Sequence, residues 1–237
     1  MQTGRAREAD RTRTAEPAAA GAATAETAAI GTAATEAGFT GAGAARAEVA
    51  PRIGAGASRP FTVHDLEGMP DDGRRYELID GELLVGAAPG WPHQGALVEL
   101  ASQLHIACTP PFRVLPAPFA VRPDPFTELR PDVLVARHED LTLRNLPTAP
   151  VLAIEVASPS SRLKDANLKK AVYARLGARF FWLVDPDLEE PSVTAWELVG
   201  GAQYQRIARV RDAEVFEAAE PFGVKFSPAD LVSGLRP

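Results

Sequence analysis

Two carboxylates, Asp132 and Glu155, occur in apolar segments where an acidic side chain is costly to bury. Glu155 lies within the run 151–157, whose other members are all Val, Leu, Ile or Ala. A buried carboxylate has to be paired, protonated or bound to a metal. Asp132 begins the apolar run 132–135, so both acids could meet at one end of a sheet and offer oxygen ligands to Mg²⁺. The alternatives are an exposed strand end for Glu155 and an ordinary Pro-Asp turn for Asp132.

A lysine follows Glu155 on the next predicted helix. Asp165 and Lys169 are four residues apart and share a helix face, which by itself indicates a surface ion pair. Because the helix comes directly after the segment that carries Glu155, Lys169 could instead reach back and stabilise charge on a scissile phosphate. The residues alone leave both interpretations open.

The histidines and the cysteine are weaker candidates for a functional site. His93 precedes a predicted helix and could contribute to the site, although a lone histidine is more often a cap or a packing residue. The spacing of the histidines is not that of a zinc site, and one cysteine cannot supply a thiolate cluster. The four histidines are His64, His93, His105 and His138.

The apolar spacing predicts the elements that hold the acids and the lysine. The run 151–157 is expected to be a central strand covered on both faces, and 131–135 a second strand. A helix should follow, capped by Ser160 or Ser161 and ended by Gly177. Its expected buried residues are Leu168, Ala171, Val172 and Leu176.

Further elements surround this core. The segments 76–79 and 82–85 should form a hairpin, because Asp80 and Gly81 between them suit a type I′ turn with positive φ. Residues 94–107 carry apolar side chains at helical spacing. This order of elements predicts an α/β (α+β) sandwich around a mixed sheet. Other strands are expected at 112–115, 119–121, 180–184, 193–198, 204–210 and 222–226.

Composition divides the 237 residues into two parts. Residues 1–58 are rich in Ala, Thr, Gly and Glu, and their only aromatic side chain is Phe39, so this part is expected to be a disordered, low-complexity tail. The alternatives are a loosely helical Ala-rich arm and sequence upstream of the true start. Residues 59–237 are expected to form the folded domain. Basic and acidic residues number 6 and 6 in the first part and 19 and 25 in the second, so the net charge of -6 belongs to the domain.

This charge excludes some classes of protein. An acidic domain is unsuited to non-specific phosphate binding through a broad basic face, but metal-binding carboxylates would themselves contribute negative charge. The single cysteine, Cys108, cannot form an internal disulfide, which favours a reducing cytoplasm. The N-terminus lacks the apolar run of a signal peptide, and no stretch is long enough to cross a bilayer. The chain is therefore expected to be soluble and cytoplasmic, with no membrane partner.

Several short stretches together carry a family resemblance. In this order and spacing they resemble the Uma family of restriction-type endonucleases, which belongs to the PD-(D/E)XK nuclease superfamily. The resemblance covers residues from about 61 to 232. Each stretch alone is weak, whereas the ordered set is specific. The stretches are 76–83, His93, 131–133, 154–160, Asp165 with Lys169 and Tyr173, and 181–186.

The resemblance implies a restriction-endonuclease-like fold and an enzyme that hydrolyses DNA phosphodiester bonds. It implies that Asp132, Glu155 and the carbonyl of Val156 bind Mg²⁺ or Mn²⁺, which would generate a hydroxide for in-line attack. Glu77, on the leading hairpin, would be an additional acid of the site. A homodimer is also implied, since cutting both strands needs two active sites.

One position departs from the superfamily's pattern. The usual lysine stands two residues after the second acid, but here that position is Ala157, and the family's pattern assigns the catalytic role to Lys169. The departure and the acidic charge leave open a catalytically inactive nuclease-fold protein that binds nucleic acid or another protein. A metal-dependent hydrolase of another phosphate-containing substrate is a third possibility.

Overall fold

The computed structural model describes residues 59–158 and 164–236, with the backbone alone at residues 164–166. The expected tail 1–58 and the expected helix caps Ser160 and Ser161 lie outside these residues. In chain order the elements are α1 (Val63–Glu67), β1 (Arg75–Ile79), β2 (Glu82–Gly86), α2 (Trp91–Ala107), β3 (Phe112–Pro116), β4 (Ala120–Asp124), β5 (Thr127–Leu129), β6 (Val133–Arg137), η1 (His138–Asp140), β7 (Asn145–Leu146), β8 (Leu152–Val156), α3 (Lys164–Leu176), β9 (Phe180–Asp185), β10 (Ser192–Leu198), β11 (Tyr204–Arg211), β12 (Phe216–Ala218), β13 (Val224–Phe226), α4 (Pro228–Val232) and η2 (Ser233–Leu235).

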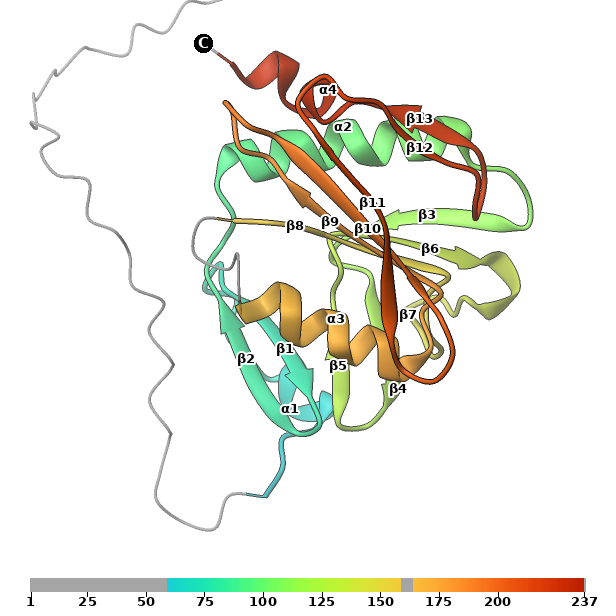
Figure 1. Cartoon of the computed structure of the whole chain (residues 1–237). Coiled ribbons are helices and arrows are strands. Elements are labelled where there is room, and N and C mark those ends of the chain that lie inside the picture. The colour runs from blue at the N-terminus through green and yellow to red at the C-terminus, as the bar shows by residue number, and fades with distance from the viewer. Residues whose placement is uncertain (1–58, 159–163, 237) are drawn as a thin grey trace, which may run out of the picture. The chain divides into compact units, whose positions relative to one another are not determined.

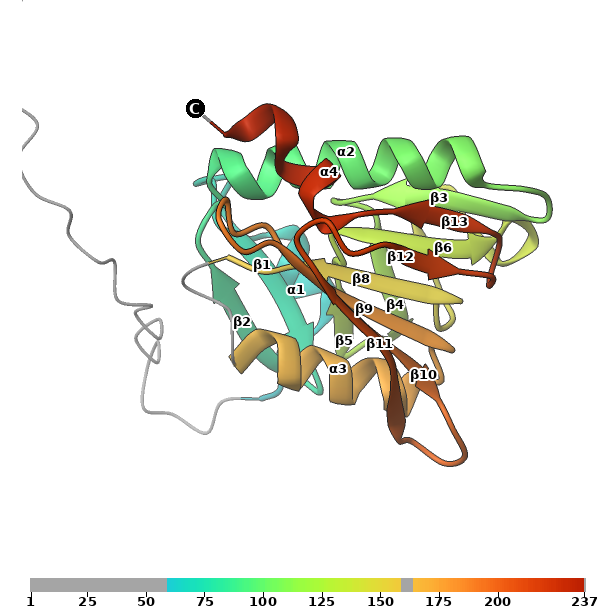
Figure 2. The same cartoon turned by 45° about the horizontal axis from the view of Figure 1, so that its top comes forward.

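A six-stranded sheet in the order β11-β10-β9-β8-β6-β3 forms the central layer. β8 and β9 run parallel and the other neighbours run antiparallel, so the sheet is mixed, as predicted. All five residues of β8 are buried, which confirms the prediction of a central strand covered on both faces. Helix α2 lies on one side of this sheet and helix α3 on the other (Figure 1, Figure 2).

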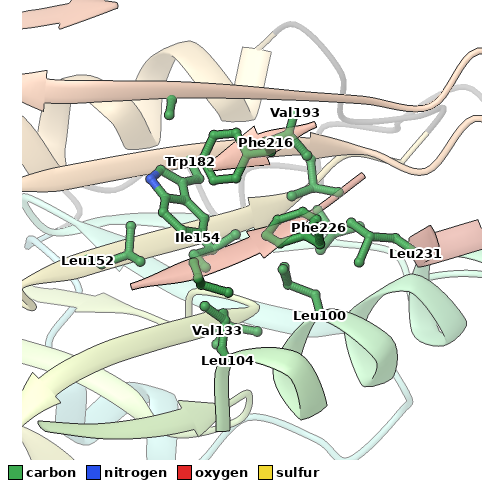
Figure 3. Close-up of a cluster of buried hydrophobic side chains, with 14 of the residues drawn as sticks. Leu100, Leu104, Val133, Leu152, Ile154, Trp182, Val193, Phe216, Phe226 and Leu231 are labelled. Carbon is green, nitrogen blue, oxygen red and sulfur yellow. The ribbon is translucent and has the colours of Figure 1, made fainter. Parts of the chain in front are cut away.

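The side of the sheet toward α2, here named the α2 face, is an apolar core. β8 contributes Leu152, Ile154 and Val156, because alternate residues of a strand point to the same side. Leu100 and Leu104 of α2 pack against them, as the helical spacing of 94–107 predicts. Figure 3 shows this cluster, which also includes Val133, Trp182, Val193, Phe216, Phe226 and Leu231.

The opposite side, here named the α3 face, is closed by α3 and by a second sheet of five strands in the order β2-β1-β5-β4-β7. Leu134, Ala153 and Phe181 of the central sheet lie in this second cluster. Tyr173 of α3 stacks on Phe181, with ring centroids 5.8 Å apart. The second sheet adds Ile79, Val121, Leu129 and Leu146.

The buried stripe of α3 differs from the prediction. Val172 is buried and Leu176 half-buried, as expected, but Leu168 is 45% exposed and Ala171 is also exposed. The buried positions include Lys169, which is only 5% exposed, and Tyr173. The prediction was wrong here because it assigned the buried face from apolar residues, whereas this face carries a buried charge.

The predicted hairpin forms from β1 and β2. Asp80 and Gly81 have φ angles of 51° and 82°, as a type I′ turn requires. A Cβ atom on Gly81 would lie 2.5 Å from the Cβ of Pro60, so the turn needs glycine for space as well. Two hydrogen bonds of 2.8 Å join Arg175 of α3 to Asp80, so the helix and the turn are held together.

Some boundaries and short strands were not predicted. α2 begins at Trp91, three residues before the expected start, and the last strand covers 224–226 rather than 222–226. The strands β5, β7 and β12 have only two or three residues each. A run this short shows no alternation that could distinguish it from a loop.

Candidate active site

Strand alternation decides which acids reach the α3 face. Ile154 and Val156 belong to the apolar core, so Glu155 between them points to the opposite side of the sheet. Asp132 lies one residue before β6 and shares the parity of Leu134, which packs on the α3 face. The α3 face therefore combines an apolar cluster with a group of charged side chains.

Asp132 is 1% exposed and is held by three neighbours. Its Oδ1 atom accepts a hydrogen bond of 2.7 Å from Arg75. Its Oδ2 atom accepts one of 2.8 Å from the Val156 N–H and lies 3.2 Å from Nε2 of His93. Burial alone would raise the pKa of Asp132, but the His93 hydrogen bond and the Arg75 charge lower it to about 2. Asp132 is thus a charged, fixed carboxylate.

Lys169 bridges two carboxylates that come from different sheets. Its Nζ atom lies 2.8 Å from Oε2 of Glu77 on β1 and 3.1 Å from Oε2 of Glu155 on β8. The remaining oxygens are also bonded, since the Tyr173 hydroxyl donates to Glu155 over 3.1 Å and the Arg130 N–H donates to Glu77 over 2.7 Å. Three elements therefore meet at one buried ammonium group.

The pKa values of Glu155 and Lys169 are both raised, but for different reasons. Burial raises the pKa of Glu155 to about 8, and the nearby Asp132 and Glu77 oppose the attraction of Lys169. Burial would lower the pKa of Lys169, but Glu155 and Glu77 raise it above its usual range. Strongly perturbed carboxyl groups that gather at one place are typical of functional sites.

The donor atoms suit a hard divalent cation. Asp132 and Glu155 offer carboxylate oxygens, which are the ligands that Mg²⁺ and Mn²⁺ prefer. In the part of the chain that the structure describes, no group of three or more His, Cys, Asp or Glu side chains is placed so that it could hold a metal ion. The carboxylates instead contact Arg75 and Lys169. The carboxylates of Asp132 and Glu155 are thus suitable ligands for a metal ion, and in this structure the side chains of Arg75 and Lys169 contact them.

The structure brings the predicted site residues together in two linked groups. Glu77, Glu155 and Lys169 are in direct contact, and Asp132 joins them through the main chain of Val156. The side chain of Asp165 lies outside the described part of the structure. Glu77, Asp132, Glu155 and Lys169 are buried, although the sequence had left an exposed strand end open for Glu155 and a surface ion pair open for Lys169.

Three members of the group were not among the predicted catalytic or metal-binding residues, although a contribution from His93 was left open. Arg75 stands two residues before Glu77, so strand alternation could have placed it on the same side. Tyr173, which the sequence analysis named only within the family resemblance, is buried and its hydroxyl donates to Glu155; its spacing of four residues from Lys169 was the available signal. His93 lies in the first turn of α2 rather than before it, and no local pattern predicted its contact with Asp132.

The fold, with its mixed sheet flanked by helices, is also found in a solved structure. A crystal structure described as that of "a putative nuclease belonging to DUF820 from Anabaena variabilis ATCC 29413" matches it with a TM-score of 0.62. The two chains are 19% identical, and the match covers 74% of this chain and 99% of the other. This likeness shows the fold.

The sequence places the chain in a particular family. The model of the Uma2 family, described as "Putative restriction endonuclease", matches residues 63–231, and the chain belongs to this family. No curated protein matches the chain. Among the described helices, none is both long and apolar enough to span a bilayer.

Proposed function

We propose that this chain is a divalent-metal-dependent endonuclease that hydrolyses the phosphodiester bonds of DNA. The observation that carries the proposal is the buried contact of Lys169 with Glu77 and Glu155. Lys169 thereby lies beside Glu155 and could take the role of the lysine that the superfamily's motif has at position 157, where this chain has alanine. Membership of the Uma2 family supports the nuclease class.

Asp132, Glu155 and the main-chain carbonyl of Val156 would hold the Mg²⁺ or Mn²⁺ ion. When bound, the cation supplies polarisation of the phosphoryl oxygens and activation of water at neutral pH. The Val156 N–H and His93 fix one oxygen of Asp132, so this carboxylate is oriented before any ligand arrives. Lys169 needs no further orientation, because two carboxylates already hold its ammonium group.

Lys169 would stabilise negative charge that develops on the phosphate during attack. A buried ammonium group acts strongly on such charge, since little water screens it. Glu77 would keep the lysine charged and in place, which is a positioning role. We also propose that the active form is a homodimer, because each active site cuts one strand.

Cleavage of plasmid and single-stranded DNA with Mg²⁺ or Mn²⁺ tests the activity. Wild type should cut and Glu155→Ala should not, while the control Glu217→Ala, which removes an exposed carboxylate on β12, should cut normally. Cleavage that survives Glu155→Ala would contradict the assignment of the site.

Metal binding gives an independent test. Calorimetric titration of Mn²⁺ should show binding to wild type and much weaker binding to Asp132→Ala. A wild type that binds no Mn²⁺ at millimolar concentration is incompatible with a metal-dependent enzyme. Sedimentation of the full chain checks the dimer separately.

A further inference from the structure

Arg75 is the most exposed of the charged side chains at the site. Its side chain is 25% exposed, whereas those of Asp132 and Lys169 are 2% and 6% exposed. It lies on β1 and points to the same side as Glu77, two residues later. Of the charged side chains at the site, that of Arg75 is therefore the most accessible to a ligand that approaches from solvent.

Arg75 is also the partner of Asp132 that can most easily be replaced. One guanidinium nitrogen donates to Oδ1 of Asp132 and the other to the carbonyl of Arg130, both over 2.7 Å. The other partners of Asp132 are the main chain of Val156 and the buried His93, and both act on Oδ2. A cation that binds Asp132 through Oδ1 must therefore compete with Arg75.

The charges explain why such an exchange would help an anionic substrate. The carboxylates of Glu77, Asp132 and Glu155 face two protein cations, Arg75 and Lys169, so the metal-free cluster has no surplus of positive charge whether or not Glu155 is protonated. It would not attract a phosphodiester. A divalent cation adds positive charge, and a guanidinium that is released from Asp132 presents a planar fork that matches phosphate oxygens.

We propose that Arg75 binds the substrate phosphate, and that in the metal-free protein it is held on Asp132, where it competes with the divalent cation. The inference rests on the proposed nuclease function and adds a substrate-binding residue to it. Arg75 has two alternative partners, the Asp132 carboxylate without metal and a phosphate oxygen with metal and DNA present. Metal binding and substrate binding are therefore coupled through one side chain.

Two binding measurements on the full chain test this coupling without relying on cleavage. Mn²⁺ affinity is measured by calorimetry, and affinity for a short fluorescein-labelled DNA duplex is measured by anisotropy at saturating Ca²⁺. In Arg75→Gln, Mn²⁺ should bind about 5- to 10-fold more tightly, because a partly exposed competitor is gone. The same variant should bind the duplex about 10-fold more weakly, because a phosphate contact is lost.

The opposite signs of the two effects separate the proposal from a structural role. If Arg75 only stabilises the site, Arg75→Gln weakens Mn²⁺ and DNA binding together, and that result or an unchanged Mn²⁺ affinity overturns the proposal. Arg75→Lys keeps the charge and should remain near wild type for Mn²⁺ while binding the duplex more weakly, which keeps the test valid if Arg75→Gln does not fold. Arg179→Gln removes a half-exposed arginine that pairs with Glu197, and should change neither affinity.

The wild type distinguishes this inference from the function on which it rests. A wild type that binds neither Mn²⁺ nor duplex contradicts the proposed nuclease. A wild type that binds both and cleaves DNA, with Arg75→Gln indistinguishable from it in both affinities, leaves the nuclease intact and contradicts only the role of Arg75.

Discussion

β8 separates two regions of opposite chemistry. On the α2 face, Leu152 and Ile154 contribute to a cluster composed of apolar side chains. On the α3 face, one residue away along the same strand, Glu155 contacts a buried lysine and a buried tyrosine hydroxyl. The residues of β8 are buried on both faces, so the difference lies in what is buried rather than in how much.

The two faces are stabilised in different ways. Burial of apolar surface on the α2 face contributes about 25 cal/mol per Å² and needs no particular orientation of the side chains. The charged group on the α3 face loses hydration that its ion pairs replace only when their geometry is good, so it adds little to stability. A buried charged cluster that adds little to stability, and in which each charge nevertheless has a partner, is expected to have a catalytic role. Substitutions on one face at a time should therefore separate stability from activity.

The largest effect should come from Lys169→Met. Cleavage should fall about 1,000-fold, equivalent to about 4 kcal/mol, because the positive charge that acts on the phosphate is lost. The free energy of unfolding should also fall, by about 3 kcal/mol, since Glu77 and Glu155 lose their shared cation. Single-turnover cleavage and urea unfolding measure the two effects. Lys225→Met, at an exposed position of β13, is the control that should change neither.

On the α2 face, Leu100→Ala should affect stability alone. Leu100 is fully buried, so the substitution leaves a cavity and should lower the free energy of unfolding by about 3 kcal/mol. Mn²⁺ affinity of the folded protein should stay within about twofold of wild type, because Leu100 lies about two turns along α2 from His93, the residue of this helix that contacts Asp132. Urea unfolding and calorimetry provide the measurements. A large loss of Mn²⁺ affinity would show that the faces are mechanically coupled.

A smaller effect is expected in the dependence of stability on pH. With a pKa of about 8, the Glu155 of the folded protein keeps a proton that the unfolded chain releases above about pH 4. The folded state binds more protons between these values, so this group makes the free energy of unfolding fall as pH rises, by at most about 1.4 kcal/mol per pH unit. Glu155→Gln cannot ionise and should lose this contribution.

Urea unfolding without metal, between about pH 5 and pH 8, checks this expectation. The difference in stability between wild type and Glu155→Gln should shift in favour of the variant as pH rises. Parallel curves for the two proteins would mean that Glu155 is already ionised throughout this range.

The smallest effect should come from Arg175→Ala. The ion pair between Arg175 and Asp80 joins α3 to the hairpin turn, but the two side chains are 52% and 56% exposed. Its loss should cost about 0.5 kcal/mol and change cleavage by less than about twofold. Thermal unfolding and the cleavage assay measure these quantities. A greater loss of activity would mean that the pair sets the distance between Glu77 and Lys169.

Local patterns were sufficient for much of the architecture. The apolar run around Glu155 predicted the buried central strand, and Asp80 with Gly81 predicted the hairpin. The acids were recognised for a related reason, since a carboxylate in a strand core stands out against its neighbours. In each case the physical cause acts within a few residues: strand alternation, positive φ in a turn, or the cost of burying a charge.

The contacts of the acids came from parts of the chain far apart in sequence. Arg75 and His93 reach Asp132 across 57 and 39 residues, and no local pattern connects such positions. Lys169 is buried and Leu168 is exposed because the side of α3 that carries Lys169 packs against Glu77 and Glu155. Apolar spacing predicts which side of a helix is apolar. The pairing of charges across three elements exists only after those elements have packed. The two acids could therefore be found in the sequence, whereas their partners depended on the fold.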